Sequence, residues 1–232
     1  QQVEEAFRQL YPDIAVARWD SDTASKPELH ERILADFAAL KIQVMVGTQM
    51  IAKGLDLPMV TLVGVVSADP GLALPDFRAG ERGFQLLAQV AGRAGRSQLP
   101  SEVVLQTYQP EHPSIVAAAQ HDYERFYAHE MAWRREAGYP PYRRLGRVLV
   151  QNAHPIEAER SIRHIADQVQ RHIEKRQLTD TQLIGPAPCF FSRIDNNYRW
   201  QLLVRSADPS AALAGLQIRP GWYIDIDPVD IL

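Results

Sequence analysis

The sequence has little cysteine and no long apolar run. One cysteine, Cys189, occurs in 232 residues, which excludes an internal disulfide framework and a multi-cysteine zinc site within this chain. The apolar run over residues 60–66 is far shorter than the roughly 20 residues of a membrane-spanning helix, and no signal peptide is present. These features favour a soluble protein of a reducing, cytoplasmic compartment.

An excess of charge of one sign is also missing. The chain has 25 Lys and Arg against 28 Asp and Glu, a net charge of -3, so any attraction to nucleic acid must come from local clusters. Residues 125–205 hold 14 basic against eight acidic side chains, and residues 206–232 hold one against four. The C-terminal half could therefore carry a basic face. The alternative is a solvated helix with ion pairs, because Glu and Arg residues between positions 157 and 163 lie one turn apart.

The sequence lacks the motifs of a complete ATPase. There is no G-x-x-x-x-G-K-[ST] loop, and no Asp-Glu pair follows a strand to hold magnesium. The histidines and Cys189 form no pattern typical of a metal site. The chain starts at Gln1, without an initiator Met and already in a helical pattern. We therefore expect a piece of a longer protein that does not hydrolyse ATP by itself.

The first hundred residues alternate amphipathic helical patterns with short β-branched runs, which predicts an α/β fold with an open parallel sheet. The expected strands cover residues 14–17, 42–46, 60–66 and 102–107, and the expected helices cover residues 3–10, 29–40 and 80–95. Ligands of such sheets bind at the carboxyl ends of the strands. The loops after residues 46, 66 and 107 are therefore the candidate positions for a site.

The rest of the chain follows a different pattern. Pro113 starts a long helical stretch that Gly138 and the next prolines end, and we expect its aromatic residues, at positions 123, 126, 127 and 133, to pack in a core. Elements in the order β-α-β-β-α-β follow, at residues 145–151, 155–175, 182–184, 198–205, 209–216 and 222–227. The predicted domains are residues 1–108, a helical connector over 109–142 and a second domain over 143–232.

Two arginines and a glutamine near residue 90 form the first motif. Gln89, Arg93 and Arg96 are spaced i, i+4 and i+7 and share one face of a helix. The motif also contains Gly92 and Gly95, each of which costs about 1 kcal/mol inside a helix unless a close approach requires it. Aligned guanidinium groups match phosphate oxygens and the charge that develops in phosphoryl transfer. The alternative is that Gly95 caps the helix and both arginines face solvent.

A second motif follows the strand over residues 42–46. Gly47 permits close approach and Thr48 can cap a helix, whose free N–H groups form an anion site. Lys53 could meet a phosphate backbone, and Asp56, two residues after Gly54, could meet a ribose hydroxyl or one of the arginines. The alternative is a helix cap followed by a surface turn.

Together the two motifs resemble motifs V and VI of superfamily 2 helicases, and the wider pattern resembles the PriA (primosomal protein N-prime) family of bacterial helicases. The resemblance covers essentially the whole chain, on the stretches at residues 47–50, 52–54, 60–63, 75–79, 81–82, 103–107, 138–142, 183–188, 198–201 and 225–228. It implies a second RecA-like lobe followed by a βαββαβ domain like that of ribosomal protein S10. One departure is the turn at residues 195–197, where the family usually carries glycine and more basic residues.

The resemblance implies an ATP-dependent DNA helicase with three-prime to five-prime polarity that recognises stalled forks and initiates primosome assembly. ATP and magnesium would be bound mainly by a first lobe outside this chain, and zinc by an upstream segment outside it. The implied partners are single-stranded and forked DNA, single-strand-binding protein and other primosome proteins, with no membrane. A non-catalytic DNA-binding or primosome-binding module is the alternative function.

The resemblance also implies roles for individual residues. Arg93 and Arg96 would contact the ATP phosphates as catalytic residues, and the other nucleotide contacts would come from Gln89, Gly54 and Asp56. Contacts with DNA would come from Gly47, Thr48, Lys53, Arg193, Arg199 and Trp200, with Phe191 as a candidate for base stacking.

Overall fold

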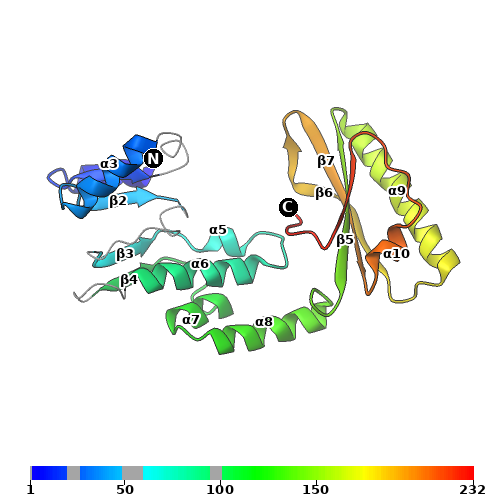
Figure 1. The fold of residues 1–232 in the computed structure, drawn as a ribbon, viewed down its shortest axis with the longest axis horizontal. Helices are drawn as coiled ribbons and strands as arrows, with labels where there is room; N and C mark the ends of the chain where they lie inside the picture. The colour runs from blue at the N-terminus through cyan, green and yellow to red at the C-terminus, as the bar shows by residue number, and fades with distance from the viewer. Residues whose placement is uncertain (1, 20–26, 49–59, 95–100) are drawn as a thin grey trace. The chain divides into compact units, whose positions relative to one another are not determined.

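The computed structural model describes residues 2–19, 27–48, 60–94 and 101–232. The chain divides into two compact units, and Figure 1 shows the elements of each. The first unit comprises Gln1–Pro70 and Arg82–Tyr123, and the second Gly71–Glu81 and Glu124–Leu232. Residues 109–123 of the expected connector group with the first unit and residues 124–142 with the second. The three predicted domain limits themselves stay a prediction.

The first unit is built on parallel strands joined by helices, as the sequence predicts. Its elements are α1 (Gln2–Leu10), β1 (Val16–Trp19), α3 (Pro27–Ala38), β2 (Val44–Gly47), β3 (Leu62–Val65), β4 (Glu102–Leu105) and α7 (Pro113–Ala119), with α5 (Asp69–Leu72) and α6 (Ala79–Ala94) at its boundary with the second unit. Strand β1 pairs in parallel with β2, and β3 with β4. Helix α3 connects the first pair and α6 lies in the connection of the second, which is the arrangement of crossover units.

Helix α6 confirms the prediction of a helix over residues 80–95 as far as Ala94. Phe84, Leu87 and Val90 are buried, and their spacing of three residues places them on one side of the helix. Burial of this apolar stripe holds the helix despite Gly80, Gly83 and Gly92, since packing outweighs intrinsic propensity.

The prediction of one long helix after Pro113 is wrong. The structure has α7 and a separate helix α8 (Tyr123–Ala137). His121 takes a left-handed conformation with φ 53°, its N–H donates to Ala118 O, and the N–H of Asp122 donates to Ala117 O. This pair of hydrogen bonds is a Schellman motif. The left-handed position of this motif is usually a glycine. Because His121 occupies it here, the sequence has no glycine that marks the end of α7.

The second unit is a βαββαβ domain preceded by α8 (Figure 1). Its elements are β5 (Arg144–Asn152), α9 (Pro155–Arg176), β6 (Gln182–Ile194), β7 (Asn197–Ser206), α10 (Pro209–Leu213) and β8 (Trp222–Ile226). The sheet order is β6-β7-β5-β8 and the neighbours are antiparallel, which is the split βαβ arrangement predicted from the sequence. Helices α9 and α10 cover one face of this sheet.

The core of the second unit lies between α9 and the sheet. Ile162, Ile165 and Val169 from the helix pack in one cluster with Val148 and Leu202 from the strands. The first two, with Leu202 and Val148, are fully buried. Alternating residues of β5 and β7 supply the strand side of this cluster, as expected for a half-covered sheet.

Strand β6 is much longer than the predicted strand over residues 182–184. It continues to Ile194 through two register shifts, between Ile184 and Ala187 and between Pro188 and Arg193. Prolines cannot donate to a ladder, so the sequence reads as the end of a strand. They are tolerated here because β6 is an edge strand and its pairing is interrupted at the bulges.

Candidate functional sites

The carboxyl end of β2 presents the start of the second motif. Gly47 pairs with Trp19 at the end of β1, and both Gly47 and Thr48 are exposed. Trp19 is buried and stacks on His30 with ring centroids 4.0 Å apart. The carboxyl end of the β1–β2 pair therefore has the stacked Trp19 and His30 rings on β1 and α3, next to the exposed Gly47 and Thr48. Lys53, Gly54 and Asp56 lie outside the described residues.

Helix α6 carries the first motif. Gln89 is exposed, and Arg93 lies one turn further along the same helix, so their positions agree with one helix face. The side chain of Arg93 and the whole of Arg96 lie outside the described residues. An exposed amide followed by an arginine on one helix suits contacts with the oxygens of a nucleotide. The roles predicted for Gln89, Arg93 and Arg96 stay predictions.

The loops after β3 and β4 are joined by one carboxylate, which the sequence reasoning missed. Asp69 Oδ1 accepts hydrogen bonds from Thr107 Oγ1 at 2.9 Å and from Tyr108 N at 3.1 Å. The N–H of Ala68 donates to Gln106 O and continues the ladder beyond the strands. Asp69 therefore fixes the carboxyl ends of this strand pair. The sequence does show an acidic residue four positions after the end of β3, at the carboxyl end of a predicted strand, and this was the signal that could have identified Asp69.

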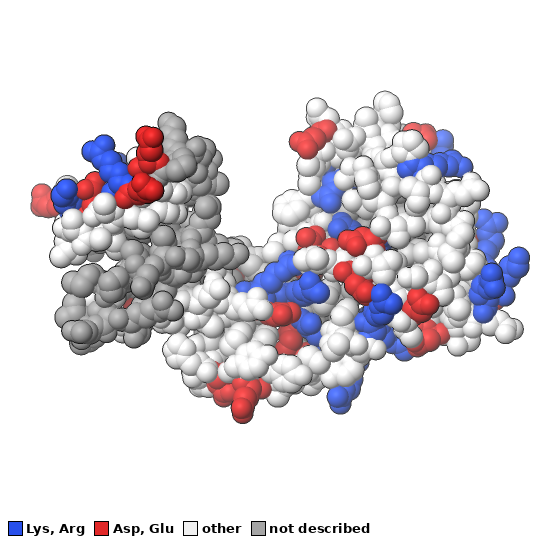
Figure 2. Space-filling view, in the orientation of Figure 1, with Lys and Arg blue, Asp and Glu red and all other residues white. Residues whose placement is uncertain are grey.

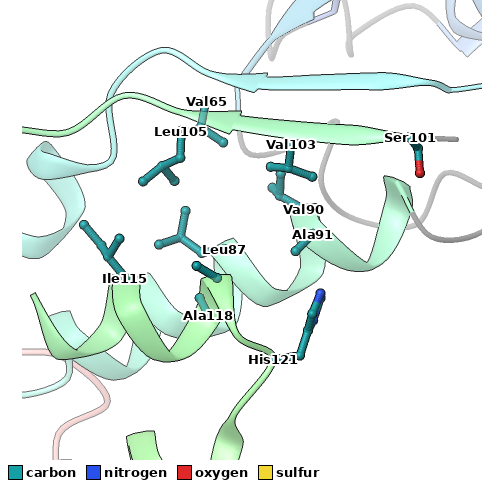
Figure 3. Close-up of a pocket in the computed structure, with 11 residues that line it drawn as sticks. Val65, Leu87, Val90, Ala91, Ser101, Val103, Leu105, Ile115, Ala118 and His121 are labelled. Atoms are coloured by element: carbon teal, nitrogen blue, oxygen red, sulfur yellow. The ribbon is translucent and has the colours of Figure 1, made fainter. Parts of the chain in front are cut away.

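A cavity of about 400 Å³ lies in the first unit under the β3–β4 pair. Figure 3 shows Val103 and Leu105 of β4 facing Leu87 and Val90 of α6, with His121 at one side. The lining is almost wholly aliphatic and offers few groups for phosphate oxygens. The cavity therefore belongs to the packing of α6 on the strands, and the candidate polar contacts lie elsewhere.

The hairpin between β6 and β7 exposes a cation and a pair of aromatic rings. Arg193 is exposed, donates from Nη2 to Asn196 Oδ1 at 3.0 Å and lies with its Cζ 5.2 Å from the centre of the Tyr198 ring. Phe190 and Phe191 are about half exposed and meet edge to face. The sequence pointed to Arg193 and Phe191, whereas Phe190 was not among the predicted contacts. An exposed guanidinium and exposed rings in one hairpin suit phosphate contact and base stacking.

Arg199 and Trp200, the other predicted DNA contacts of this hairpin, are packed into the sheet. Trp200 packs against the core under α9. Arg199 is buried and donates to Phe191 O and to Leu232 O, both at 3.3 Å. Consecutive strand residues face opposite sides, so the two side chains enter opposite layers of the same unit. In this arrangement the Arg199 guanidinium is engaged by carbonyls of its own chain.

The last residues of the chain are bound through their main-chain carbonyls, by side chains on the sheet face opposite α9 and by Arg78, which precedes α6. Arg78 donates to Val229 O at 2.8 Å, Arg147 to Leu232 O at 2.8 Å, and Gln201 to Ile231 O at 3.0 Å. Among the described residues, Arg147 Nε, Arg199 Nε and Gln201 Oε1 are buried without a hydrogen-bond partner. Burying a donor is favourable only where an acceptor meets it. The main-chain carbonyls of Leu232 and Ile231 accept from Arg147 Nη2 and Gln201 Nε2 and so satisfy these two donors.

Charges of both signs are interspersed on the face of the second unit seen in Figure 2. On α9, Arg160 lies 3.0 Å from Glu157 and Arg163 lies 2.7 Å from Glu159. The alternative of a solvated helix with ion pairs is thereby confirmed for α9. Exposed pairs of this kind contribute little to stability.

One ion pair changes the pKa of its carboxyl group. Arg144 Nε donates to Asp227 Oδ2 at 3.0 Å. This hydrogen bond and the guanidinium charge lower the pKa of Asp227, and a hydrogen bond from the backbone of Leu145 acts in the same direction. The same pairing raises the pKa of Arg144. The pair joins the start of β5 to the end of β8.

The expectation that the aromatic residues of α8 pack in a core holds only for Phe126. Phe126 is buried, whereas Tyr123, Tyr127 and Trp133 are exposed by 60%, 51% and 42%. Trp133 contacts Tyr139, with centroids 5.5 Å apart. The helix repeat brings only one side of α8 against neighbours, and the sequence does not show which side this is.

Two features are not found in the described part of the chain. No helix there is long and apolar enough to cross a membrane. No group of three or more His, Cys, Asp or Glu side chains within it could hold a metal ion.

Family models match the chain in two successive regions. Residues 1–98 match the helicase conserved C-terminal domain, and residues 135–229 match the primosomal protein N C-terminal domain. The first match contains the β1–β2 pair, strand β3 and the residues of both motifs, whereas β4 lies just beyond it. The second contains the βαββαβ domain. These matches support a RecA-like α/β lobe followed by a different domain.

Curated relatives resemble the chain over nearly its whole length. Replication restart protein PriA of Bacillus subtilis (strain 168) is 46% identical over 205 residues, which are 88% of this chain and 25% of that protein. The protein of the same name from Synechocystis sp. is 41% identical over 238 residues, 100% of this chain and 28% of its own length. That of Haemophilus influenzae is 41% identical, over 100% of this chain and 32% of its own length. The chain thus spans about a quarter to a third of these relatives.

Proposed function

Because the chain belongs to the PriA family of replication restart proteins and corresponds to a C-terminal part of them, we propose that it is part of an ATP-dependent DNA helicase of superfamily 2. The helicase would have three-prime to five-prime polarity, recognise stalled forks and initiate primosome assembly in the cytoplasm. Its partners would be single-stranded and forked DNA, single-strand-binding protein and other primosome proteins. The observation that carries this proposal is the succession of the two domain matches along one chain.

In this proposal the first unit completes a nucleotide site and does not form one alone. Gln89 and Arg93 on α6, and Arg96 after it, would contact the phosphates of ATP. The ATP and its magnesium ion would be bound mainly by another lobe of the protein. An arginine fork neutralises charge that develops on phosphate oxygens during transfer. Gly54 and Asp56 would add contacts with the nucleotide. The chain alone would not hydrolyse ATP, and zinc would belong to a segment outside it.

DNA would be contacted at two places. Gly47 and Thr48 are exposed at the end of β2, where they and Lys53 would couple the bound strand to the nucleotide. In the second unit, Arg193 would hold a phosphate while the exposed rings of Phe190 and Phe191 stack on bases. Arg199 and Trp200 would act indirectly, by holding the hairpin on the sheet.

The substitution Arg93→Ala in the full-length protein tests the nucleotide role. We expect DNA-stimulated ATP hydrolysis to fall by about 10³-fold, as when an arginine finger is removed. Arg32→Ala is the matched control, because Arg32 is 81% exposed on α3 of the same unit. ATP hydrolysis at the wild-type rate in Arg93→Ala would contradict the proposed role.

Salt-dependent DNA binding tests the hairpin. Fluorescence anisotropy of the purified chain with forked DNA should show a log Kd against log salt slope that is smaller by about one in Arg193→Ala, since one phosphate contact is lost. Arg163→Ala removes an exposed, ion-paired arginine from α9 and should leave the slope unchanged. Equal slopes in wild type and Arg193→Ala would remove the hairpin from the DNA site and favour the alternative of a module that binds primosome proteins.

A further inference from the structure

Helix α6 crosses the boundary between the two units. Its first three residues, Ala79–Glu81, group with the second unit, whereas residues 82–94 group with the first. The segment before it, from Gly71, also groups with the second unit. The helix that carries Gln89 and Arg93 therefore begins inside the packing of the C-terminal half of the chain.

A buried arginine fixes the start of this helix through its charge. Arg134 of α8 is 8% exposed; its Nη2 lies 2.8 Å from Glu81 Oε2, and its Nε lies 2.8 Å from Glu130 Oε1. Its Nη1 donates to Pro140 O at 3.3 Å. A buried guanidinium held by two carboxylates has a defined geometry, and removing it leaves those carboxylates without their partner.

Aromatic packing fixes the residues just before the helix. Phe77 is 4% exposed and stacks on Tyr139 with ring centroids 5.3 Å apart, and the Arg134 Cζ lies 5.2 Å from the centre of the Phe77 ring. Arg78 donates to Val229 O. The Cζ of Arg205 also lies near Tyr139, 5.4 Å from the centre of its ring. Arg205 is on β7, the strand that begins at the hairpin of Arg193.

We propose that Phe77, Arg78 and Glu81 form an anchor that couples the C-terminal domain to the nucleotide-facing end of α6, with Arg134 as a positioning residue. This proposal rests on the proposed function. The rise of an α-helix places Arg93 about 18 Å from Glu81 along the axis. A helix transmits a displacement of its first turn to its far end, so DNA bound at the β6–β7 hairpin changes the position of Arg93 through β7, Tyr139 and the anchor.

The first test compares two neighbouring arginines of α8 in the full-length protein. Arg134→Met keeps the length of the buried side chain but removes its charge, and Arg135→Met removes the same charge from an exposed position. We expect the ratio of DNA-stimulated to basal ATP hydrolysis to fall about tenfold in Arg134→Met, within the usual range of coupling between sites. Basal hydrolysis should persist, and Arg135→Met should keep the wild-type ratio. An unchanged ratio in Arg134→Met overturns the anchor.

A second measurement uses the 232-residue chain and a milder variant, in case Arg134→Met folds poorly. Glu81→Gln removes one charge at a residue whose side chain is 36% exposed. Hydrogen exchange of the amides over residues 84–92 should be faster in Glu81→Gln than in Arg135→Met, because a released helix start opens more often. Equal exchange in these two variants overturns the anchor.

The two tests separate this inference from the proposed function. Wild-type hydrolysis in Arg93→Ala would contradict the nucleotide role while the exchange measurement still decides whether Glu81 fixes α6. Lost hydrolysis in Arg93→Ala together with a wild-type ratio in Arg134→Met would keep the nucleotide role and overturn only the anchor.

Discussion

Single residues of the β6–β7 hairpin differ in what their side chains can reach. Arg193 is exposed, whereas Arg199 is buried and bonded to carbonyls of its own chain. Both are arginines in the same hairpin, and the difference comes from the side of the sheet that each one faces and from what covers that side. A basic residue near a hairpin is thus a candidate for phosphate contact only where its guanidinium is exposed, as in Arg193, and not where it is buried among carbonyls of its own chain, as in Arg199.

Gly221 is a residue whose identity is set by its backbone. Its φ is +82°, and a Cβ there would lie 2.5 Å from Gln151 O. We predict that Gly221→Ala lowers the free energy of unfolding by about 1–3 kcal/mol, the usual cost of strained backbone. Chemical denaturation of the chain measures this. Gly215→Ala is the comparison, because φ there is also positive, at +81°, but nothing lies within 4 Å of its Cβ. Equal losses in the two variants would contradict the steric part of the argument.

Asp227 should make stability depend on pH in the acid range. Its pKa is lowered in the folded chain by Arg144, so the unfolded chain binds the proton more tightly. The stabilisation is therefore present above about pH 4, the unfolded pKa, and is lost as the pH falls through the lower folded pKa. We expect Asp227→Asn to lose less stability than wild type between pH 5 and 2 in urea titrations.

The backbone of Asp227 tolerates this substitution, since its φ is 55° and asparagine also adopts that conformation. Asp225→Asn, an exposed change on β8, is the control and should follow the wild-type curve. The effect will be small because the Arg144–Asp227 pair is half exposed. If the stability of Asp227→Asn depends on pH as that of the wild type does, the Arg144–Asp227 pair is not the source of the pH dependence.

At the scale of elements, the turn of the β6–β7 hairpin has a defined geometry that does not require glycine. Ile194 pairs with Asn197, so the turn has two residues, Asp195 and Asn196, with φ of 48° and 62°. Two consecutive positive φ values are typical of a type I′ turn, which accepts Asn, Asp and Gly. The turn therefore keeps its geometry without glycine, and its basic group is the neighbouring Arg193.

The same turn should become more stable with glycine at its second position. Asn196→Gly removes the cost of a left-handed residue with a Cβ and also the exposed hydrogen bond from Arg193, and we expect a net gain below about 1 kcal/mol in the free energy of unfolding. Asn197→Gly, in the first position of β7, should instead lose about 0.5–1 kcal/mol. Thermal or urea unfolding of the two variants measures both. A loss in Asn196→Gly would contradict the assigned turn type.

At the scale of the whole molecule, the second unit is assembled from two distant pieces of chain. Gly71–Glu81 groups with Glu124–Leu232, through Phe77 on Tyr139 and Glu81 on Arg134. A fragment of residues 124–232 should therefore lack part of its own packing. We predict that a peptide of residues 71–82 raises its melting temperature, and that the shift grows with the logarithm of the peptide concentration once this exceeds the Kd.

Calorimetry of the fragment with increasing peptide measures this stabilisation. A peptide with Phe77→Ala and Glu81→Gln should give no shift, because it lacks both the stacked ring and the charge that Arg134 binds. An Arg134→Met fragment should respond less than the wild-type fragment to the unchanged peptide. No shift with the unchanged peptide at high concentration would show that the segment contributes nothing to the unit by itself.

The sequence by itself determined the α/β fold, the parallel pairs of the first unit, the βαββαβ order of the second and the family. Those features follow from periodicity and motifs, which are local and can be read along the chain. It placed Gln89 and Arg93 on a helix, which α6 confirms to Ala94. It missed the break at His121, because a Schellman motif without glycine has no local signal.

Only the tertiary structure decided which side of each element is covered and by what. It turned Arg199 toward the last residues of the chain and Trp200 toward α9, left Phe190 open, and joined the start of α6 to Arg134. These outcomes depend on contacts between residues as far apart as Arg78 and Val229. Propensity and spacing describe one element at a time, whereas the choice between a buried and an open side chain is made by the partners that folding brings to it.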